Sequence, residues 1–134
     1  MRIALLLLTV LLCLAQPAFA DDIGAAQDVI RSQEQAFAHD DAKAAYSYAA
    51  PAIRQMFPEA GIFMFMVQHS YGPVYRHKSF EFGQVRAEDG RIAQRVHIID
   101  TDGKPWEALY TLEQQDDGSF KIIGCMLLKA GDAV

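Results

Sequence analysis

The sequence predicts one α+β domain, in which helices come first and pack on one face of a four-stranded antiparallel meander. Up to about residue 71 the apolar residues recur at helical spacing, whereas after Tyr75 they alternate with polar ones. Three Asp-Gly steps divide this second half, and Asp-Gly between alternating residues is a strong hairpin signal. The steps are Asp89-Gly90, Asp102-Gly103 and Asp117-Gly118.

Residues 1–20 predict a signal peptide rather than a part of the fold. Arg2 precedes an apolar run of about a dozen residues, and Ala18-Phe19-Ala20 places small residues where a signal peptidase cuts. A bilayer-spanning helix needs about 20 apolar residues, so a retained membrane anchor is the less favoured alternative. We therefore expect cleavage after Ala20, a mature domain of residues 21–134, and a periplasmic or secreted protein.

The composition of the mature chain excludes several classes of partner. Removing 20 of the 134 residues leaves 114, the size of one domain, and loss of Arg2 changes the net charge from −5 to −6. An acidic chain without a basic stripe predicts no nucleic-acid partner and no membrane attachment after the leader is removed. Cys125 is then the one remaining cysteine, and we interpret its thiol as a small buried apolar group.

Two helices are expected before the first central proline. An apolar stripe predicts a helix over residues 23–38, with Asp22 or Asp21 as its cap. The following turn contains Asp41, which is placed to cap a short, alanine-rich second helix. Proline removes a backbone donor and cannot continue a helix, so Pro51 stops the second helix or begins the next one.

The third helical region begins at Pro51, is interrupted at Pro58 and ends at Gly72-Pro73. Its run of residues 62–67 is apolar all round, so we expect it to be deeply covered. The stretch that follows, residues 69–83 (HSYGPVYRHKSFEFG), is rich in aromatic and basic groups. We interpret it as a structural corner between helix and sheet rather than a reaction centre, because Gly-Pro punctuation and alternating aromatics account for it.

The turns between the four strands determine which side chains share a face. If each Asp-Gly step forms a two-residue turn with positive φ at both positions, the register of every hairpin is set. One face then carries aromatic residues and no acid, and we expect the helices to cover it. The predicted strands are residues 79–88, 91–100, 105–115 and 119–129. The expected covered face consists of Phe80, Phe82, Gln84, Arg86, Ala93, Arg95, His97, Ile99, Trp106, Ala108, Tyr110, Leu112, Ile123, Cys125 and Leu127.

This register aims Arg95 and His97 into an otherwise apolar cavity, close to Gln84 and Tyr110. A buried arginine without an anion is costly, so the arrangement predicts a pocket with a polar end. The alternative, that both side chains point to solvent from the outer face, stays open. Branched apolar residues alternate with them on the second strand, and a single β-bulge would reverse the faces.

The candidate ligand site combines three polar groups with an aromatic wall. Arg95, His97 and Tyr110 would meet the polar end of a ligand, and no catalytic residue is assigned. The predicted ligand-binding residues are Arg95, His97, Tyr110, Trp106, Phe80, Phe82, Gln84 and Tyr75. Tyr71 and Arg76 are expected beside Tyr75 at the cavity mouth.

Few reaction types are compatible with the motifs present. The histidines, at positions 39, 69, 77 and 97, lack metal-ligand spacing, and no phosphate loop or Gly-x-Ser-x-Gly elbow occurs. We therefore expect no metal and no cofactor. An isomerase-like or dehydratase-like enzyme would need a base and an opposing donor, for which the sequence offers His97 and Tyr110. A Cys125–His97 pair lacks a third residue to orient the histidine, which disfavours a thiol enzyme.

Several strings, in the same order, resemble a family of short exported bacterial proteins, the domain-of-unknown-function family 4864. These strings are FAHDDAKAAYSYAAPAIRQMF, YGPVYRHKS, GRIAQRV, DGKPWEALYTL and DGSFKIIGCML. The family looks like a member of the nuclear-transport-factor-2-like (cystatin-like) superfamily, which implies a curved sheet wrapped around helices to form a cone. That superfamily includes ketosteroid isomerase-like enzymes, dehydratases and inert binding modules, so the resemblance implies a pocket but no particular chemistry.

Three functions are therefore under consideration. The first is a noncatalytic periplasmic domain that binds a small, largely apolar molecule with a polar or acidic end. The second is an isomerase-like or dehydratase-like enzyme that uses the same cavity. The third is an interaction module that forms a homodimer through an apolar patch on the outer sheet face. That patch would consist of Val96, Ile98, Leu109 and Met126.

Overall fold

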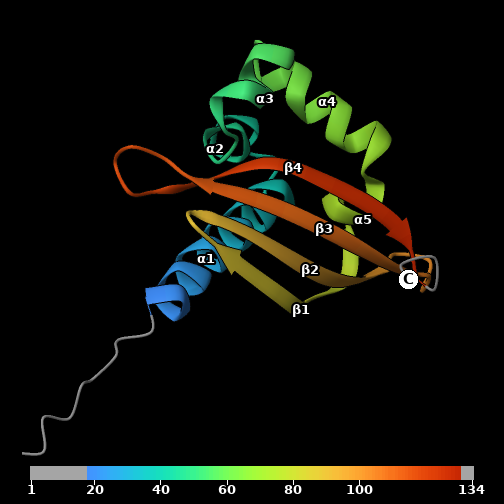
Figure 1. Ribbon diagram of the computed structural model, residues 1–134. Helices are drawn as coiled ribbons and strands as arrows, with labels where there is room; N and C mark the ends of the chain where they lie inside the picture. Colours follow the sequence, from blue (N-terminus) through green and yellow to red (C-terminus); the bar gives the residue numbers. More distant parts are fainter. Residues whose placement is uncertain (1–17, 131–134) are drawn as a thin grey trace, which may run out of the picture.

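The computed structural model describes residues 18–130, and it has the predicted α+β architecture with helices preceding the sheet (Figure 1). The four strands follow one another in the order β1-β2-β3-β4, and all neighbours are antiparallel. The helices are α1 (Ala18–Ala38), α2 (Ala42–Ser47), α3 (Pro51–Met56), α4 (Ala60–Ser70) and α5 (Gly72–Tyr75). The strands are β1 (His77–Glu88), β2 (Arg91–Asp100), β3 (Pro105–Gln114) and β4 (Phe120–Lys129).

The helix boundaries follow the local signals at Asp41 and Pro51, but the predicted start of the first helix is wrong. Helix α1 already includes Ala18, so Asp21 and Asp22 lie inside it and neither is its cap. Asp41 caps α2 as predicted, because its Oδ1 accepts a hydrogen bond from the backbone nitrogen of Ala44 at 3.0 Å. Pro51 occupies the first turn of α3, where its missing donor costs nothing. The prediction that Gly72-Pro73 only ends a helix was incomplete, because these residues begin the one-turn helix α5. Of the predicted signal peptide, residues 1–17 lie outside the described part of the chain.

The three turns of the meander differ from one another, and this corrects the predicted register. At the first turn Asp89 and Gly90 both have positive φ, as a two-residue turn requires, and Glu88 faces Arg91. At the second turn the nitrogen of Asp100 donates to Lys104 O at 2.9 Å, which leaves a three-residue loop closed by Gly103 at φ +83°. A left-handed glycine at the end of a three-residue loop is a common hairpin geometry, so the one-residue slip on β2 has a local cause.

Two β-bulges shift the faces further. On β1 the register changes between Phe82 and Val85, and on β4 it changes opposite Thr111 and Leu112. The third turn is also a three-residue loop, since Gln115 pairs with Ser119. The bulge in β4 compensates for this extra residue, so that the pairing from Thr111 back to Trp106 is the predicted one. The predicted covered face is therefore right for Phe80 and Phe82 on β1, throughout β3 and for Cys125 and Leu127 on β4. It is wrong for Gln84, Arg86, Ala93, Arg95, His97 and Ile99, which lie on the outer face.

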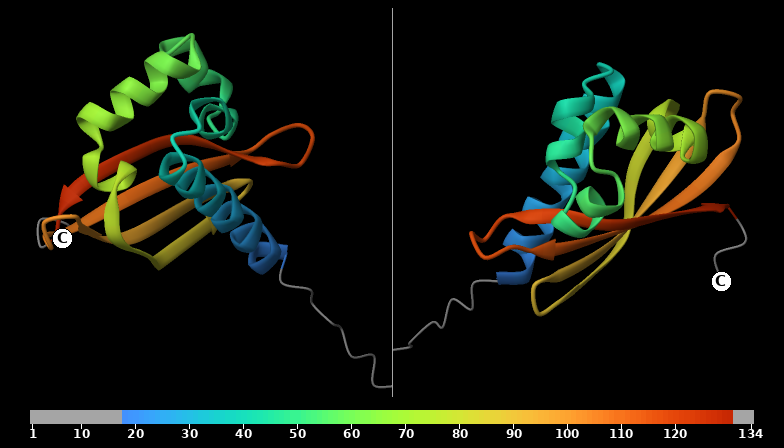
Figure 2. Two further views of the ribbon diagram at one scale, coloured as in Figure 1. Left: turned by 180° about the vertical axis from the view of Figure 1, so that it is seen from behind. Right: turned by 90° about the horizontal axis from the view of Figure 1, so that it is seen from above.

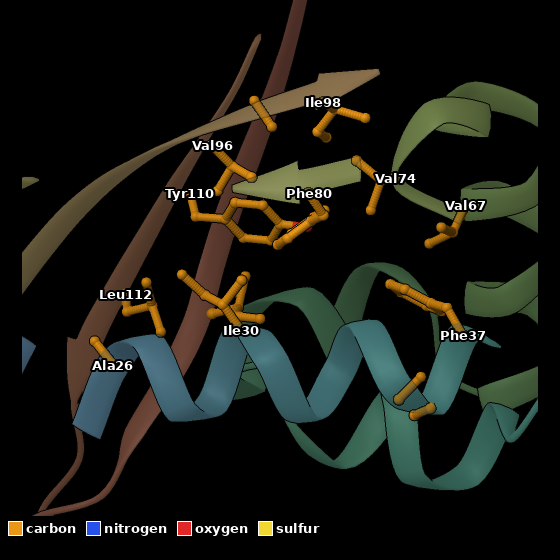
Figure 3. Packing of buried hydrophobic residues seen from close by; sticks show 14 of the residues in the cluster. Ala26, Ile30, Phe37, Val67, Val74, Phe80, Val96, Ile98, Tyr110 and Leu112 are labelled. Atoms are coloured by element: carbon orange, nitrogen blue, oxygen red, sulfur yellow. The ribbon is translucent and has the colours of Figure 1, made fainter. Parts of the chain in front are cut away.

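The core lies between α1 and the inner face of the sheet. In Figure 3, Ile30 on α1 points at the sheet, and Tyr110, Phe80 and Val96 approach it from the strands. Ile30, Val96 and Leu112 are fully buried. Burial of branched and aromatic side chains on both sides makes this interior mostly apolar. The fully buried Gln94 is the exception, and its amide is hydrogen-bonded to Gln27 and to Gly83 O.

Helices α3 and α4 form an arm that stands over β4 rather than lying flat on the sheet (Figure 2). Helix α4 packs chiefly against α2 and α5, and α3 touches β4. The prediction that residues 62–67 are deeply covered is wrong: Phe63 and Met64 are buried, but Ile62 and Phe65 are 49% and 60% exposed. A helix that is apolar all round but is covered on one side presents its other side to solvent. None of the helices in the described part of the chain is long and apolar enough to cross a membrane.

Candidate functional site

The space between the α3–α4 arm, the end of α1 and β4 contains a cavity of about 240 Å³. Phe37 from α1, Ile53 and Met56 from α3, and Phe63 and Val67 from α4 form much of its wall. Met56 is 72% exposed, so this side of the cavity reaches the surface. None of the described residues that line the cavity carries a formal charge.

The polar end of the cavity is formed by Tyr110 on β3, Cys125 on β4 and Tyr71 at the end of α4. The Tyr71 hydroxyl donates a hydrogen bond to Cys125 O at 3.0 Å, which joins the helical arm to the edge strand. Burial raises the pKa of the Cys125 thiol to about 12, although its contact with Tyr110 acts in the opposite direction. Burial likewise raises the pKa of Tyr110 well above its usual value. The thiol and the phenol are therefore neutral hydrogen-bonding groups near neutral pH rather than nucleophiles.

Gln33 on α1 adds an amide to the cavity wall. Its side chain is buried, with a residue exposure of 4%, and its Nε2 donates to Ala45 O at 3.1 Å. Ala45 O is an acceptor, so the nitrogen of the amide must face it and the oxygen must face elsewhere. Sequence reasoning missed Gln33, although a polar residue within the apolar stripe of the first helix was a visible signal.

Arg95 and His97 do not reach this cavity, and the prediction that they face the interior is wrong. The three-residue loop at Gly103 moves both to the outer face of β2. Arg95 lies 3.2 Å from a carboxylate oxygen of Glu107, and His97 is exposed and packs over Gly83. The Tyr110 hydroxyl and the His97 imidazole therefore lie on opposite faces of the sheet, as do Cys125 and His97. Neither of the predicted catalytic pairings exists in this arrangement.

The predicted aromatic wall is only partly assembled. Phe80 is buried and its ring lies 6.3 Å from that of Tyr110, as expected for an inner-face residue. Phe82 lies on the same face, but its ring is covered by the Arg31 guanidinium at 4.5 Å. Trp106 also faces inward, at the rim of the sheet, where its Nε1 donates to Asp100 Oδ2 at 2.8 Å. These three side chains belong to the packed interior and its margin, and they do not line the cavity.

The remaining predicted ligand-binding residues have structural contacts. Gln84 is exposed on the outer face, within the bulge of β1. The Tyr75 hydroxyl donates to Asp40 Oδ1, and Arg76 Nη2 donates to the same oxygen at 2.6 Å. These two hydrogen bonds lower the pKa of Asp40, the Tyr75 contact more than the Arg76 contact. Together Tyr75 and Arg76 hold α5 against the end of α1. Of the three residues predicted at the cavity mouth, Tyr71 alone lines the cavity.

A second polar cluster, formed by Arg31, Glu34 and His77, connects α1 to the start of β1. His77 Nε2 lies 2.6 Å from Glu34 Oε2, and its Nδ1 lies 2.9 Å from Pro73 O. Arg31 Nη1 donates to Glu34 Oε1 at 2.8 Å and to Phe80 O at 3.0 Å. The hydrogen bonds of the cluster all join described residues of this chain, so we interpret the cluster as a structural link between α1 and the sheet. Among the described residues, no group of three His, Cys, Asp or Glu side chains is arranged to hold a metal ion.

The outer sheet face lacks half of the predicted dimer patch. Val96 and Ile98 are fully buried on the inner face, so the prediction that they lie on the outer face is wrong. The cause is the three-residue loop at Gly103, as for Arg95. Leu109 and Met126 do lie on the outer face, and Met126 is 58% exposed. Leu109 and Met126 are direct cross-strand partners, but two adjacent side chains are too small an area for the predicted apolar patch.

The comparisons with known proteins return one result. The sequence model of a family described as "Domain of unknown function (DUF4864)" matches residues 20–133. No curated protein and no solved structure matches the chain.

Proposed function

The chain belongs to the family described as Domain of unknown function (DUF4864), and from this premise we propose that it is an exported, noncatalytic domain that binds a small, largely apolar molecule. The observation that carries the proposal is the cavity of about 240 Å³ between the α3–α4 arm and β4. An apolar cavity of roughly 150 Å³ is large enough for benzene, so this one has room for a bicyclic or similarly compact molecule. Most ligand sites in proteins are concave and apolar with a few polar groups, and this cavity has that character.

The charge of the lining narrows the class of ligand. Arg95 and His97 were expected to meet an acidic group, but both lie on the other face of the sheet. The polar groups that remain at the cavity, among them Gln33, Tyr71 and Tyr110, are neutral. An ionised carboxylate would lose its hydration without gaining a counter-ion there, which costs several kcal/mol. We therefore propose a neutral ligand rather than an acid.

An isomerase-like or dehydratase-like activity is the less supported alternative. Such a reaction needs a base beside the substrate, and the described residues that line the cavity include no His, Asp, Glu or Lys. The thiol of Cys125 could act as a nucleophile only as a thiolate, and its pKa of about 12 opposes that at neutral pH. The nuclear-transport-factor-2-like relationship stays part of the proposal, supported by the order of helices and strands.

Export is supported by the leader-like sequence of residues 1–20. Cleavage after Ala20 would remove the first three residues of α1 and leave its core-facing residues in place. The test is the intact mass of the protein recovered from the periplasm or medium of a bacterial host. A mass that begins at Asp21 supports export, and a full-length protein retained in the cytosol contradicts it.

Ligand binding is tested by native mass spectrometry of the mature protein purified from cells without denaturation. We expect a bound mass of a few hundred daltons at most, released on unfolding, because the cavity limits the size of the occupant. The matched control carries Ala49→Leu, which adds bulk to a cavity-lining position that is 1% exposed. An empty protein that is not stabilised by any compact neutral apolar compound in a thermal-shift screen would contradict the proposal.

A further inference from the structure

The amide oxygen of Gln33 is the feature of this cavity that the fold itself leaves unexplained. Among the described residues, Gln33 makes one side-chain hydrogen bond, from Nε2 to Ala45 O at 3.1 Å. Oε1 therefore has no donor within residues 18–130, although the residue is only 4% exposed. Among the described residues, every fully buried side-chain oxygen or nitrogen has a hydrogen-bond partner. Because Gln33 Oε1 has none, this oxygen is not fully buried, and we infer that it is accessible from the cavity that Gln33 lines.

A buried amide is a costly choice for a position that needs only an apolar side chain. Leaving a buried acceptor unpaired costs about 1–3 kcal/mol, so a donor is expected from the contents of the cavity, either water or a bound ligand. The contact to Ala45 O, which also accepts from Tyr48 N at 3.3 Å, explains the amide nitrogen but leaves the amide oxygen without a role. Gln33 thus offers a directed acceptor in a wall that is otherwise mostly apolar.

Tyr110 supplies the complementary group in the same cavity. It is 2% exposed, and its side-chain hydrogen-bond partner among the groups that affect its pKa is the Cys125 thiol, which bonds weakly. Burial keeps this phenol protonated, so it is available to donate a hydrogen bond. An amide oxygen that accepts and a phenol that donates match a ligand group able to do both.

We propose that the cavity selects a neutral apolar molecule that carries a hydroxyl group, with Gln33 Oε1 accepting from that hydroxyl and the Tyr110 hydroxyl donating to it. This inference rests on the proposed binding function and names the chemical class of its ligand. Gln33 and Tyr110 are then the residues that determine specificity, while the aromatic and aliphatic wall supplies most of the affinity. A molecule without the hydroxyl leaves Gln33 Oε1 without a donor and is disfavoured for that reason.

The experiment compares naphthalene, 2-naphthol and 2-naphthoate, which share one ring system and differ in one group. Dissociation constants for the mature protein are measured by NMR titration, which also shows whether the cavity residues respond. We expect 2-naphthol to bind about five- to tenfold more tightly than naphthalene, the worth of about one net hydrogen bond. We expect 2-naphthoate to bind at least about 100-fold more weakly than 2-naphthol, because no cation meets its charge.

Three variants assign the preference to the residues. In Gln33→Met, which keeps the shape but removes the acceptor, the ratio of the two affinities should fall to about one. Tyr110→Phe should also reduce the ratio, and it serves if Gln33→Met does not fold. Gln84→Met makes the same chemical change on the outer face and should leave the ratio unchanged.

Each result decides between the two proposals. Equal binding of naphthalene and 2-naphthol, or a preference that survives both Gln33→Met and Tyr110→Phe, would overturn this inference and leave ligand binding intact. Tightest binding of 2-naphthoate would overturn the neutral class. If none of the three compounds perturbs the cavity residues at its solubility limit, both the inference and the proposed function for compact ligands fail.

Discussion

The two ends of the molecule use apolar residues differently. Under α1 the interior is filled, with Ile30, Val96 and Leu112 at 1% exposure or less (Figure 3). Under the α3–α4 arm, where α4 is even more apolar in sequence, there is a cavity and Phe65 is 60% exposed. Greater hydrophobicity of a helix therefore does not predict tighter packing beneath it.

The reason lies in the distribution of apolar residues around each helix. Helix α1 has one apolar stripe and one polar side, so it lies on the sheet in a single orientation and buries that stripe. Helix α4 is apolar on all sides, and it packs chiefly against α2 and α5. Because α4 packs mainly on other helices rather than on the sheet, space is left between the arm and β4, and this space is the cavity.

The largest expected effect contrasts two adjacent positions on β4. Cys125 faces the cavity with a pKa of about 12, against an ordinary value of 9.0, whereas Met126 is exposed on the outer face. At pH 8 the mature protein should react with a thiol-specific disulfide reagent roughly 1,000-fold more slowly than the Cys125→Ala/Met126→Cys variant, because the thiolate is the reactive form. Stopped-flow absorbance measures both rates, and similar rates would show that the hollow end does not shield the thiol.

Truncation of a core side chain should separate the two ends by stability. Leu112→Ala removes a fully buried side chain from the filled end and should lower the free energy of unfolding by about 2–5 kcal/mol. Ile62→Ala on α4, where the side chain is 49% exposed, should cost only about 0.5 kcal/mol. Urea denaturation of both variants measures the difference, and equal losses would mean that α4 is packed as tightly as the core.

Enlargement of a side chain tests the same contrast from the opposite direction. Ala108→Leu forces extra atoms into the filled end at a position with no exposure and should destabilise by about 1–3 kcal/mol. Ala49→Leu makes the identical change at the cavity wall and should cost less than about 1 kcal/mol while it weakens ligand binding. A larger loss of stability at Ala49 than at Ala108 would argue that the cavity is not available space.

The smallest effect is expected at the rim, where Trp106, the one tryptophan of the chain, provides a reporter. The indole hydrogen bond, followed by the backbone bond from Lys104, lowers the pKa of Asp100 from 3.8. A lowered carboxyl pKa stabilises the fold above pH 3.8, and this contribution is lost as the pH falls through the folded-state value. Trp106 emission should therefore shift in acid before the domain unfolds, and Asp100→Asn should abolish the shift.

Strands β2 and β3 show how much of the candidate site local sequence patterns could predict. On β3 the inward side chains, Tyr110 among them, were predicted correctly. On β2 the assumption of a two-residue turn placed Arg95 and His97 inside, although the alternation of Ile92, Val96 and Ile98 indicated the opposite. Asp100 accepts backbone hydrogen bonds from Asp102 and Lys104, at 2.9 and 2.8 Å, and this wraps the loop around its carboxylate. That Asx-type turn, rather than Asp-Gly alone, set the register.

The amino-acid sequence alone determined the order of the main helices and strands, the positions of the turns between the strands, the Asp41 cap, and the family to which the chain belongs. These features depend on residues within a few positions of one another, which a linear pattern records. The cavity and the Gln33 amide that faces it were decided by tertiary structure. They arise where α1, the α3–α4 arm and β4 meet, and these segments are far apart in the chain. The three-residue loop at Gly103 is likewise the reason that Arg95 and His97 point away from the inner face.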